Sequence, residues 1–233
     1  MIPRLGDAAN SPFPPVHSAL KDPDGLLAWG GDLDPERLIQ AYLRGIFPWY
    51  SQGQPILWWS PSKRCVIVPD QLHVSRRLAR TIRKKDFRIT ADLAFADVVS
   101  ACAAPGPQRT STWITSEIAS AYMQLHVLGL GHSIEIWRGD HLVGGIYGLS
   151  MGGMFFGESM FSAGRDGSKL ALVALCRAMQ RWSFDLLDCQ IPNPHLLSLG
   201  AVSVPREQFL KQLQFSLEKE TRTGSWTNEF ANV

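Results

Sequence analysis

The sequence predicts an α+β fold in which a small N-terminal domain, 1–62, precedes a larger domain, 63–233, with a mixed, mostly antiparallel sheet. Three observations favour this fold. The N-terminal segment is rich in proline, glycine and tryptophan and has one convincing helix. Three strand-like segments separated by glycine turns occupy the middle of the chain. A helix and a further strand follow them.

The N-terminal helix is predicted from its two ends. Asp34 is a suitable N-cap and Pro35 suits the first helical position, so the helix should continue over 36–44. Gly45 then ends it.

The domain boundary is placed near Ser62 by a change of pattern. Pro61 closes an apolar run, and 64–68 has the composition of the first strand of a larger unit.

A basic amphipathic helix is predicted after Ser75, which can cap it. Val74, Leu78 and Ile82 form an apolar stripe at helical spacing. The basic residues that lie away from this stripe are Arg76, Arg80, Arg83 and Lys84. This face could bind nucleic-acid phosphates, or it could be an ordinary solvated surface.

The middle of the chain predicts a helix over 116–128 and then an antiparallel meander. The strands of the meander are 133–137, 141–149 and 154–161, joined by turns at 139–140 and 152–153. A helix over 168–182 and a strand over 184–190 complete the pattern. The polar stretch 218–233 is expected to be loosely ordered.

Composition excludes several classes of protein. The 233 residues include four scattered cysteines and six dispersed histidines, so neither disulfides nor a metal site is predicted. No apolar run is long enough to cross a membrane, and the first residues lack the order of a secretory signal. We therefore expect a cytoplasmic protein. A net charge of +2 is too small to attract a polyanion unless the basic side chains are clustered on one surface.

Two local motifs suggest chemistry that their context weighs against. Gly148, Ser150 and Gly152 match the serine-hydrolase elbow, with Asp188 and His195 as conceivable partners, but an elbow must lead into a helix and here another strand follows. We interpret these glycines as hairpin turns.

The second motif, 162–168, leads into a helix whose N-terminus could hold the pyrophosphate of coenzyme A. An acetyl-CoA-dependent N-acetyltransferase is therefore the alternative function, although Asp166 would repel a phosphate.

Polar residues among apolar ones indicate a site on two strands. Strand alternation predicts that Asp188 and Gln190 share a face while Cys189 points away, and that Glu158 and Met160 share a face. A buried charge is costly unless it is paired, so charged and polar side chains among these apolar residues indicate a functional site. The alternative is that they form an exposed cluster at the sheet edge with only a structural role.

The sequence resembles the leucyl/phenylalanyl-tRNA-protein transferases over roughly 13–209. The residues that carry the resemblance are 25–27, 30–33, Tyr42, 44–49, 57–61, 112–115, 132–135, 157–162, 188–190 and 198–201. The resemblance implies a larger domain with the acetyltransferase-like (GNAT-like) fold. It also implies an enzyme that transfers leucine or phenylalanine, and conceivably methionine, from aminoacyl-tRNA to N-terminal arginine or lysine, marking proteins for N-end rule degradation. No cofactor, metal or membrane is implied, and we expect a monomer.

The resemblance also assigns roles to residues. It gives catalysis to Asp188 and Gln190, with the Gln190 amide oxygen accepting a proton from the incoming amine and Asp188 polarising the amide. The chemistry of the side chains leaves an alternative open, because a neutral amide is a very weak base and Gln190 could only orient the amine. The carboxylates, Glu158 among them, could also attract the cationic acceptor. The implied aminoacyl pocket consists of Ile146, Phe155, Met160, Leu172, Leu175, Met179 and Leu187. Trp49 and Trp113 would stack on the terminal adenine, and the basic helix would hold tRNA phosphates. Leu175 and Met179 stand where aromatic residues are common, which leaves the preference between leucine and phenylalanine open.

Overall fold

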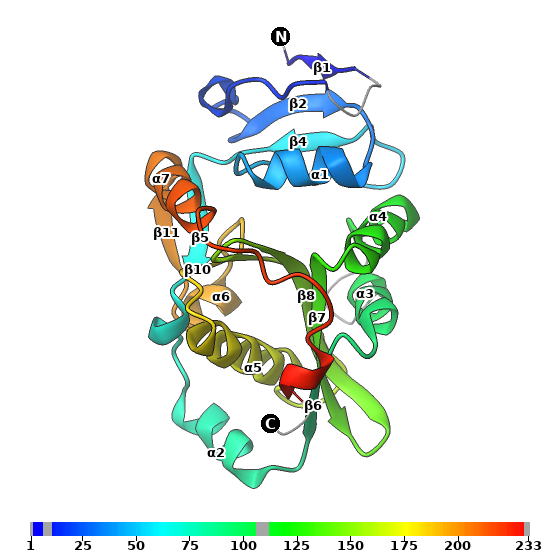
Figure 1. Cartoon of the computed structure of the whole chain (residues 1–233), viewed down its shortest axis with the longest axis vertical. Helices are drawn as coiled ribbons and strands as arrows, with labels where there is room; N and C mark the ends of the chain where they lie inside the picture. Colours follow the sequence, from blue (N-terminus) through cyan, green and yellow to red (C-terminus); the bar gives the residue numbers. More distant parts are fainter. Residues whose placement is uncertain (1, 7–10, 106–111, 231–233) are drawn as a thin grey trace.

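The computed structural model describes residues 2–6, 11–105 and 112–230, which form two β-sheets (Figure 1). The smaller sheet has the strand order β1-β2-β4-β3. Its strands are β1 (Arg4–Leu5), β2 (Leu26–Gly30), β3 (Phe47–Pro48) and β4 (Leu57–Trp59). Helix α1 (Pro35–Tyr42) follows β2. The predicted cap is confirmed, because the Asp34 side chain accepts a hydrogen bond from the Glu36 N–H, but the helix ends two residues before Arg44.

The larger sheet has seven strands in the order β11-β5-β10-β9-β8-β7-β6. They are β5 (Lys63–Ile67), β6 (Arg88–Ala91), β7 (Gly131–Arg138), β8 (His141–Met151), β9 (Met154–Ser162), β10 (Leu186–Asp188) and β11 (Val202–Pro205). Neighbours pair antiparallel except β9 and β10, which are parallel. The predicted α+β class, mixed sheet and antiparallel meander are confirmed.

The remaining helices surround the larger sheet. They are α2 (Arg76–Lys84), α3 (Phe95–Ala103), α4 (Ser116–Val127), α5 (Gly167–Arg181), α6 (Pro194–Ser198) and α7 (Arg206–Ser216), with short 3-10 turns η1 (Val16–Ser18), η2 (Pro69–Gln71) and η3 (Thr227–Phe230). Figure 1 shows α3 and α4 beside one face of the sheet and α5 beside the other. Among the helices of the described residues, none combines the length and apolar character that crossing a membrane requires.

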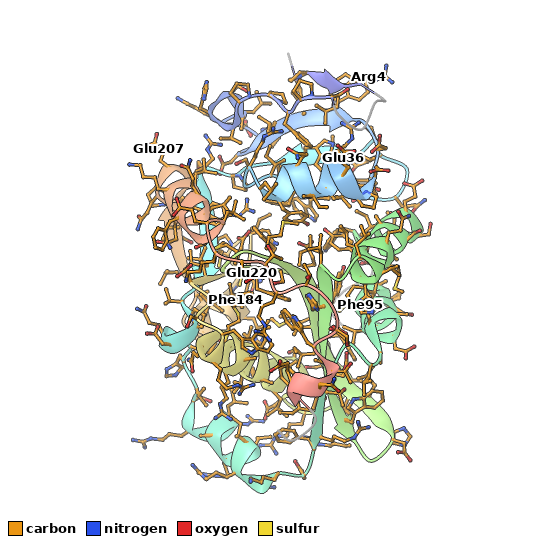
Figure 2. The ribbon with its side chains drawn as sticks, viewed as in Figure 1. Arg4, Glu36, Phe95, Phe184, Glu207 and Glu220 are labelled. Carbon is orange, nitrogen blue, oxygen red and sulfur yellow. The ribbon has the colours of Figure 1, made fainter. Side chains whose placement is uncertain are left out.

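Two buried clusters lie on opposite faces of the larger sheet. Ile146 and Tyr147 are neighbours on β8 but belong to different clusters, because successive strand side chains point to opposite faces. The first cluster joins Tyr147 to α3, α4 and the small sheet, where Trp58 is fully buried. The second joins Ile146 to α5. Figure 2 shows the side chains between the ribbons, where the labelled Phe95 belongs to the first cluster and Phe184 to the second.

The C-terminal stretch corrects one prediction. Instead of being loosely ordered, 219–230 packs across the larger sheet, and Trp226 and Phe230 are buried in the second cluster. The backbone N–H of Trp226 donates to the Asp92 carboxylate, and the Trp226 ring stacks on His132 at 3.7 Å between ring centroids. Two aromatic side chains therefore anchor a segment whose composition is otherwise polar. Residues 231–233 of the predicted tail lie outside the described residues.

Candidate active site

A first cavity of about 260 Å³ opens beside the strands β9 and β10. Four residues of the predicted aminoacyl pocket line it, namely Ile146, Met160, Leu172 and Leu187. The other three, Phe155, Leu175 and Met179, are buried in the cluster that includes Ile146, Leu172 and Leu187, and they do not line the cavity. The structure therefore places part of the predicted pocket at the cavity wall and the rest in the surrounding core.

Sequence reasoning missed three further residues in the wall of the first cavity. They are Ile191, Asn193 and Leu196, and the wall also includes Cys189, which belongs to the motif 188–190 but was predicted to point away. Asn193 caps α6 by accepting a hydrogen bond from the Leu196 N–H at 2.9 Å, and this cap orders the segment that follows Gln190. The pattern Asn193-Pro194 before an apolar pair is a helix start, and it is the signal that could have found this wall.

A second cavity of about 280 Å³ adjoins the first and brings the two predicted stacking residues together. Trp49 and Trp113 both line it, beside Phe47 and Pro48. Five residues border both cavities, namely Glu158, Cys189, Gln190, Ile191 and Asn193. A molecule with an apolar group in the first cavity and a planar ring in the second would therefore pass directly over Glu158 and Gln190.

Glu158 stands at a β-bulge, which corrects the prediction that it shares a face with Met160. Tyr147 pairs with Ser159 and Gly148 pairs with Gly157, so β9 has one residue more than β8 between these pairs. The Glu158 carboxylate consequently reaches tyrosines of the first cluster, whereas Met160 packs against the second.

The bulge also explains Gly148, which is not a hairpin turn as predicted. It lies inside β8, and a Cβ atom there would be 2.0 Å from the carbonyl oxygen of Phe156. Only glycine permits the two strands to approach this closely.

Two buried tyrosines hold the Glu158 carboxylate. Tyr42 of α1 donates to Oε1 and Tyr122 of α4 donates to Oε2, each at 2.7 Å, and the two phenol oxygens also contact each other. These are three oxygen–oxygen contacts, but the two phenols supply only two protons. A proton on the Glu158 carboxyl supplies the third, so all three contacts can be hydrogen bonds when this carboxyl is protonated. Burial raises the pKa of Glu158 to about 7, although the tyrosine hydrogen bonds act in the opposite direction.

Gln190 leaves the strand instead of continuing it. β10 ends at Asp188, not at Gln190, and Gln190 has a left-handed φ of 53°. Its side-chain Nε2 donates to Glu158 Oε1 at 3.3 Å. The prediction that Gln190 and Asp188 share one face while Cys189 points away is therefore wrong, because strand alternation stops at Asp188 and Cys189 lines the cavity beside Gln190.

Asp188 is buried behind the cavity and paired with Arg64 of β5. Arg64 Nε and Nη2 donate to the two carboxylate oxygens at 2.8 and 2.7 Å. The guanidinium lies between the rings of Phe47 and Phe209, at 4.6 and 4.7 Å from their centroids. Asp188 also accepts the backbone N–H of Gln190 at 3.0 Å. Asp188 thus contacts the turn that positions Gln190 and does not itself reach the cavity wall.

The two motifs that suggested other chemistry do not form working sites. Ser150 is fully buried within β8, which turns directly into β9, so the rejection of a hydrolase elbow is confirmed. At the start of α5, the Ser168 N–H donates to the Ser162 hydroxyl, and the Asp166 carboxylate accepts from Thr81. The Ser162 hydroxyl therefore already accepts one of the N–H groups at this helix end, and the nearby carboxylate of the N-cap residue Asp166 would repel an anion.

The predicted basic residues lie together on α2. Ser75 caps the helix by accepting the Leu78 N–H, as predicted, and Leu78 is buried. The exposed side chains include Arg76, Arg80, Arg83 and Lys84. Figure 1 shows α2 at the end of the molecule opposite the small sheet, so this surface is separate from the cavities beside Trp49.

Comparisons with known proteins point to one family. Residues 66–214 match the family described as leucyl/phenylalanyl-tRNA protein transferase, and 31–62 match the N-terminal domain of that family. A leucyl/phenylalanyl-tRNA-protein transferase of Xanthomonas euvesicatoria is 53% identical over 227 residues, which covers 97% of this chain and 91% of that protein. The corresponding protein of Stutzerimonas stutzeri is 52% identical over 207 residues, covering 89% and 92%.

A solved structure is similar at a much lower level. The C-terminal domain of a putative lysylphosphatidylglycerol synthetase from Agrobacterium fabrum has 9% sequence identity and a TM-score of 0.40, covering 84% of this chain and 65% of that one.

Proposed function

The chain belongs to the leucyl/phenylalanyl-tRNA protein transferase family, and on that premise we propose that it transfers leucine or phenylalanine from aminoacyl-tRNA to the N-terminal arginine or lysine of acceptor proteins. It is an aminoacyltransferase. The observation that carries the proposal is the shared wall of the two cavities at Glu158 and Gln190. This arrangement suits a substrate in which an apolar amino acid is joined to a nucleoside.

The reaction needs positioning more than activation. The amine of the acceptor attacks the ester carbonyl of aminoacyl-tRNA, an amide bond forms, and the ribose hydroxyl leaves with a proton. Because the ester is already activated, the enzyme has to align the two groups, assist the removal of the amine proton and stabilise the oxyanion.

The first cavity is the proposed site of the amino-acid side chain. Ile146, Met160, Leu172 and Leu187 would contact it, and Phe155, Leu175 and Met179 would shape the core around these residues. An apolar wall suits leucine, phenylalanine or methionine, and it disfavours charged side chains by leaving them unpaired.

The second cavity is the proposed site of the terminal adenine. Trp49 is 42% exposed and Trp113 is half-buried, so both have indole surface available for stacking. Base stacking on an aromatic side chain contributes about 1 to 3 kcal/mol per base. The exposed cations of α2 would contact tRNA phosphates elsewhere on the molecule.

Glu158 and Gln190 are the proposed catalytic pair. Nε2 of Gln190 donates to Glu158, which leaves Oε1 of the amide to accept a hydrogen bond from the incoming amine. We assign Gln190 to orienting the amine, since a neutral amide is a weak base. Glu158 would attract the cationic acceptor in its ionised form, which its pKa of about 7 makes accessible near neutral pH. Asp188 would act as a positioning residue through the Gln190 backbone.

Further features of the protein are also proposed. The meander β7 to β9, followed by α5 and a strand parallel to β9, supports an acetyltransferase-like fold for the larger domain. The separate sheets on either side of Ser62 are consistent with domains at 1–62 and 63–233. Cytoplasmic location, a monomeric state and a role in N-end rule degradation belong to the same proposal.

One assay tests this function. The protein is incubated with an arginine-initiated peptide, Leu-tRNA and acetyl-CoA, and the peptide product is identified by mass. We expect a leucine adduct. An acetyl adduct would identify the alternative N-acetyltransferase, and an unmodified peptide would contradict transfer altogether.

A further inference from the structure

A third cavity, of about 430 Å³, continues from the second. It shares Trp49 and Trp113 with the second cavity and is bordered further out by Gln54, Leu57, Trp59 and Thr112. The three cavities therefore form a series, in which the first meets the second at Gln190 and the second meets the third at the two tryptophans.

The third cavity presents aromatic surface in a fixed orientation. The Trp49 and Trp59 rings meet edge to face at 5.6 Å between centroids, and the Trp59 indole N–H donates to the Trp49 carbonyl at 2.6 Å. Trp59 lies on β4 and is half-buried. A rigid indole that borders an open cavity is a stacking platform suited to the flat face of a base.

The order of the cavities matches the order of units at the end of aminoacyl-tRNA. In that strand the amino acid is joined to the terminal adenosine, and the adenosine is joined to a cytidine. If the amino acid lies in the first cavity and the adenine in the second, the third cavity is the space that the preceding nucleotide meets beyond Trp49 and Trp113. We propose that the third cavity binds the base of that cytidine by stacking on Trp59, an inference that rests on the proposed function.

The chemistry of the wall indicates what is recognised. Within the described part of the chain, no charged side chain lines this cavity, so the binding would come from the base and not from its phosphate. The Gln54 side chain is exposed beside the cavity, and its Oε1 accepts the Ser51 N–H at 2.9 Å, so its Nε2 is the group that can donate to a base edge.

Three leucyl esters test the proposal, with an arginine-initiated peptide as acceptor. They are leucyl-adenosine, the leucyl ester of cytidylyl-adenosine, and the same dinucleotide ester with an abasic sugar in place of the cytidine. We expect kcat/KM of the cytidylyl ester to exceed that of leucyl-adenosine by about 5- to 150-fold, the range that corresponds to one stacked base. The abasic ester should resemble leucyl-adenosine.

Variants of Trp59 give a matched comparison. In Trp59→Leu, kcat/KM of the cytidylyl ester divided by kcat/KM of leucyl-adenosine should fall close to one. Trp59→Phe keeps a ring but loses the N–H, and it should keep most of the wild-type value of this ratio. Because each ratio is taken within one variant, a general loss of activity cancels.

Two outcomes overturn the proposal while Leu-tRNA still reacts. In one, the cytidylyl ester is no better than leucyl-adenosine or than the abasic ester; in the other, its advantage survives in Trp59→Leu. If Leu-tRNA itself transfers no leucine, the proposed function has failed and not this subsite alone.

Discussion

At the scale of single residues, Gln190 owes its position to groups that hold its backbone and its side chain separately. The backbone N–H is bound by Asp188, which is itself held by Arg64, and the side chain is bound by Glu158. The amide is therefore placed before any substrate arrives, which is what an orienting group requires.

Replacing Gln190 tests this role. Gln190→Ala should slow peptide-bond formation by about tenfold or more, because the amine loses its alignment while the cavities remain. Single-turnover rates with saturating Leu-tRNA measure the effect. Asn193→Ala is a useful comparison because it removes a helix cap in the same wall, and a wild-type rate in Gln190→Ala would contradict the role.

The Glu158 carboxyl predicts a pH dependence of stability. Its pKa is raised from 4.5 to about 7, so between these values the folded protein keeps a proton that the unfolded chain has released. The free energy of unfolding should therefore fall as pH rises from about 4.5 to 7. The full pKa change corresponds to about 3 kcal/mol.

Glu158→Gln should remove this dependence. Urea unfolding at several pH values between 5 and 8 measures it, and the variant should gain stability relative to wild type as the pH increases. Glu207→Gln, at the exposed carboxyl labelled on α7 in Figure 2, is the control and should follow wild type. Parallel curves for wild type and Glu158→Gln would show that the carboxyl is ionised in the folded protein at all these pH values.

At the scale of elements, local sequence patterns predicted the helices α1, α2, α4 and α5 and the meander, but not the helices α3, α6 and α7. They also did not predict the two places where a strand departs from regularity. The bulge at Glu158 changes which face its side chain occupies, and the left-handed residue Gln190 ends β10 early. Both departures occur at the cavity wall, where regular alternation would have pointed the polar groups elsewhere.

The basic face of α2 makes a prediction at this scale. Reversing the charges of Arg76, Arg80 and Lys84 to glutamate should weaken tRNA binding about tenfold or more. It should also reduce the dependence of affinity on salt. The slope of the logarithm of the binding constant against the logarithm of salt concentration should become shallower by about one unit for each phosphate that the helix no longer neutralises. Binding measured across a range of salt concentrations tests both effects.

A control with the same change of net charge separates local contact from general repulsion. Reversal of the exposed residues Lys21, Arg181 and Lys211 should weaken binding much less. Equal reductions of affinity in the two triple variants would identify α2 as an ordinary solvated face.

At the scale of the whole molecule, one buried cluster connects the two sheets. Trp58 of β4 and Tyr147 of β8 belong to it, and Tyr42 of α1 reaches Glu158 of β9 directly. The Arg64 guanidinium adds a second link, because it donates to the Gly45 carbonyl while it is paired with Asp188.

This continuity predicts a single unfolding transition, even though the chain divides into two sheets near Ser62. Disrupting the small sheet with Trp58→Ala should destabilise the whole protein by about 3 to 5 kcal/mol, because it leaves a large cavity in the shared core. Calorimetry, together with circular dichroism in the near and far ultraviolet, measures the transition. Two separate transitions in wild type would mean that the sheets unfold independently.

Local sequence is sufficient for the features that depend only on neighbouring residues. The cap at Asp34, the turns at 139–140 and 152–153 and the amphipathic α2 follow from local steric and hydrogen-bonding preferences, so a short window contains their cause. The motifs that resemble the family, 157–162 and 188–190 among them, are likewise a property of the sequence alone.

How those residues meet depends on long-range packing. Tyr42 and Tyr122 are 80 positions apart, and Arg64 and Asp188 are 124 apart, so no local pattern specifies that they touch. The raised pKa of Glu158, the supporting place of Asp188 and the series of cavities all depend on such contacts. Burial, dielectric environment and strand register are properties of the packed molecule, because they arise only when distant segments come together.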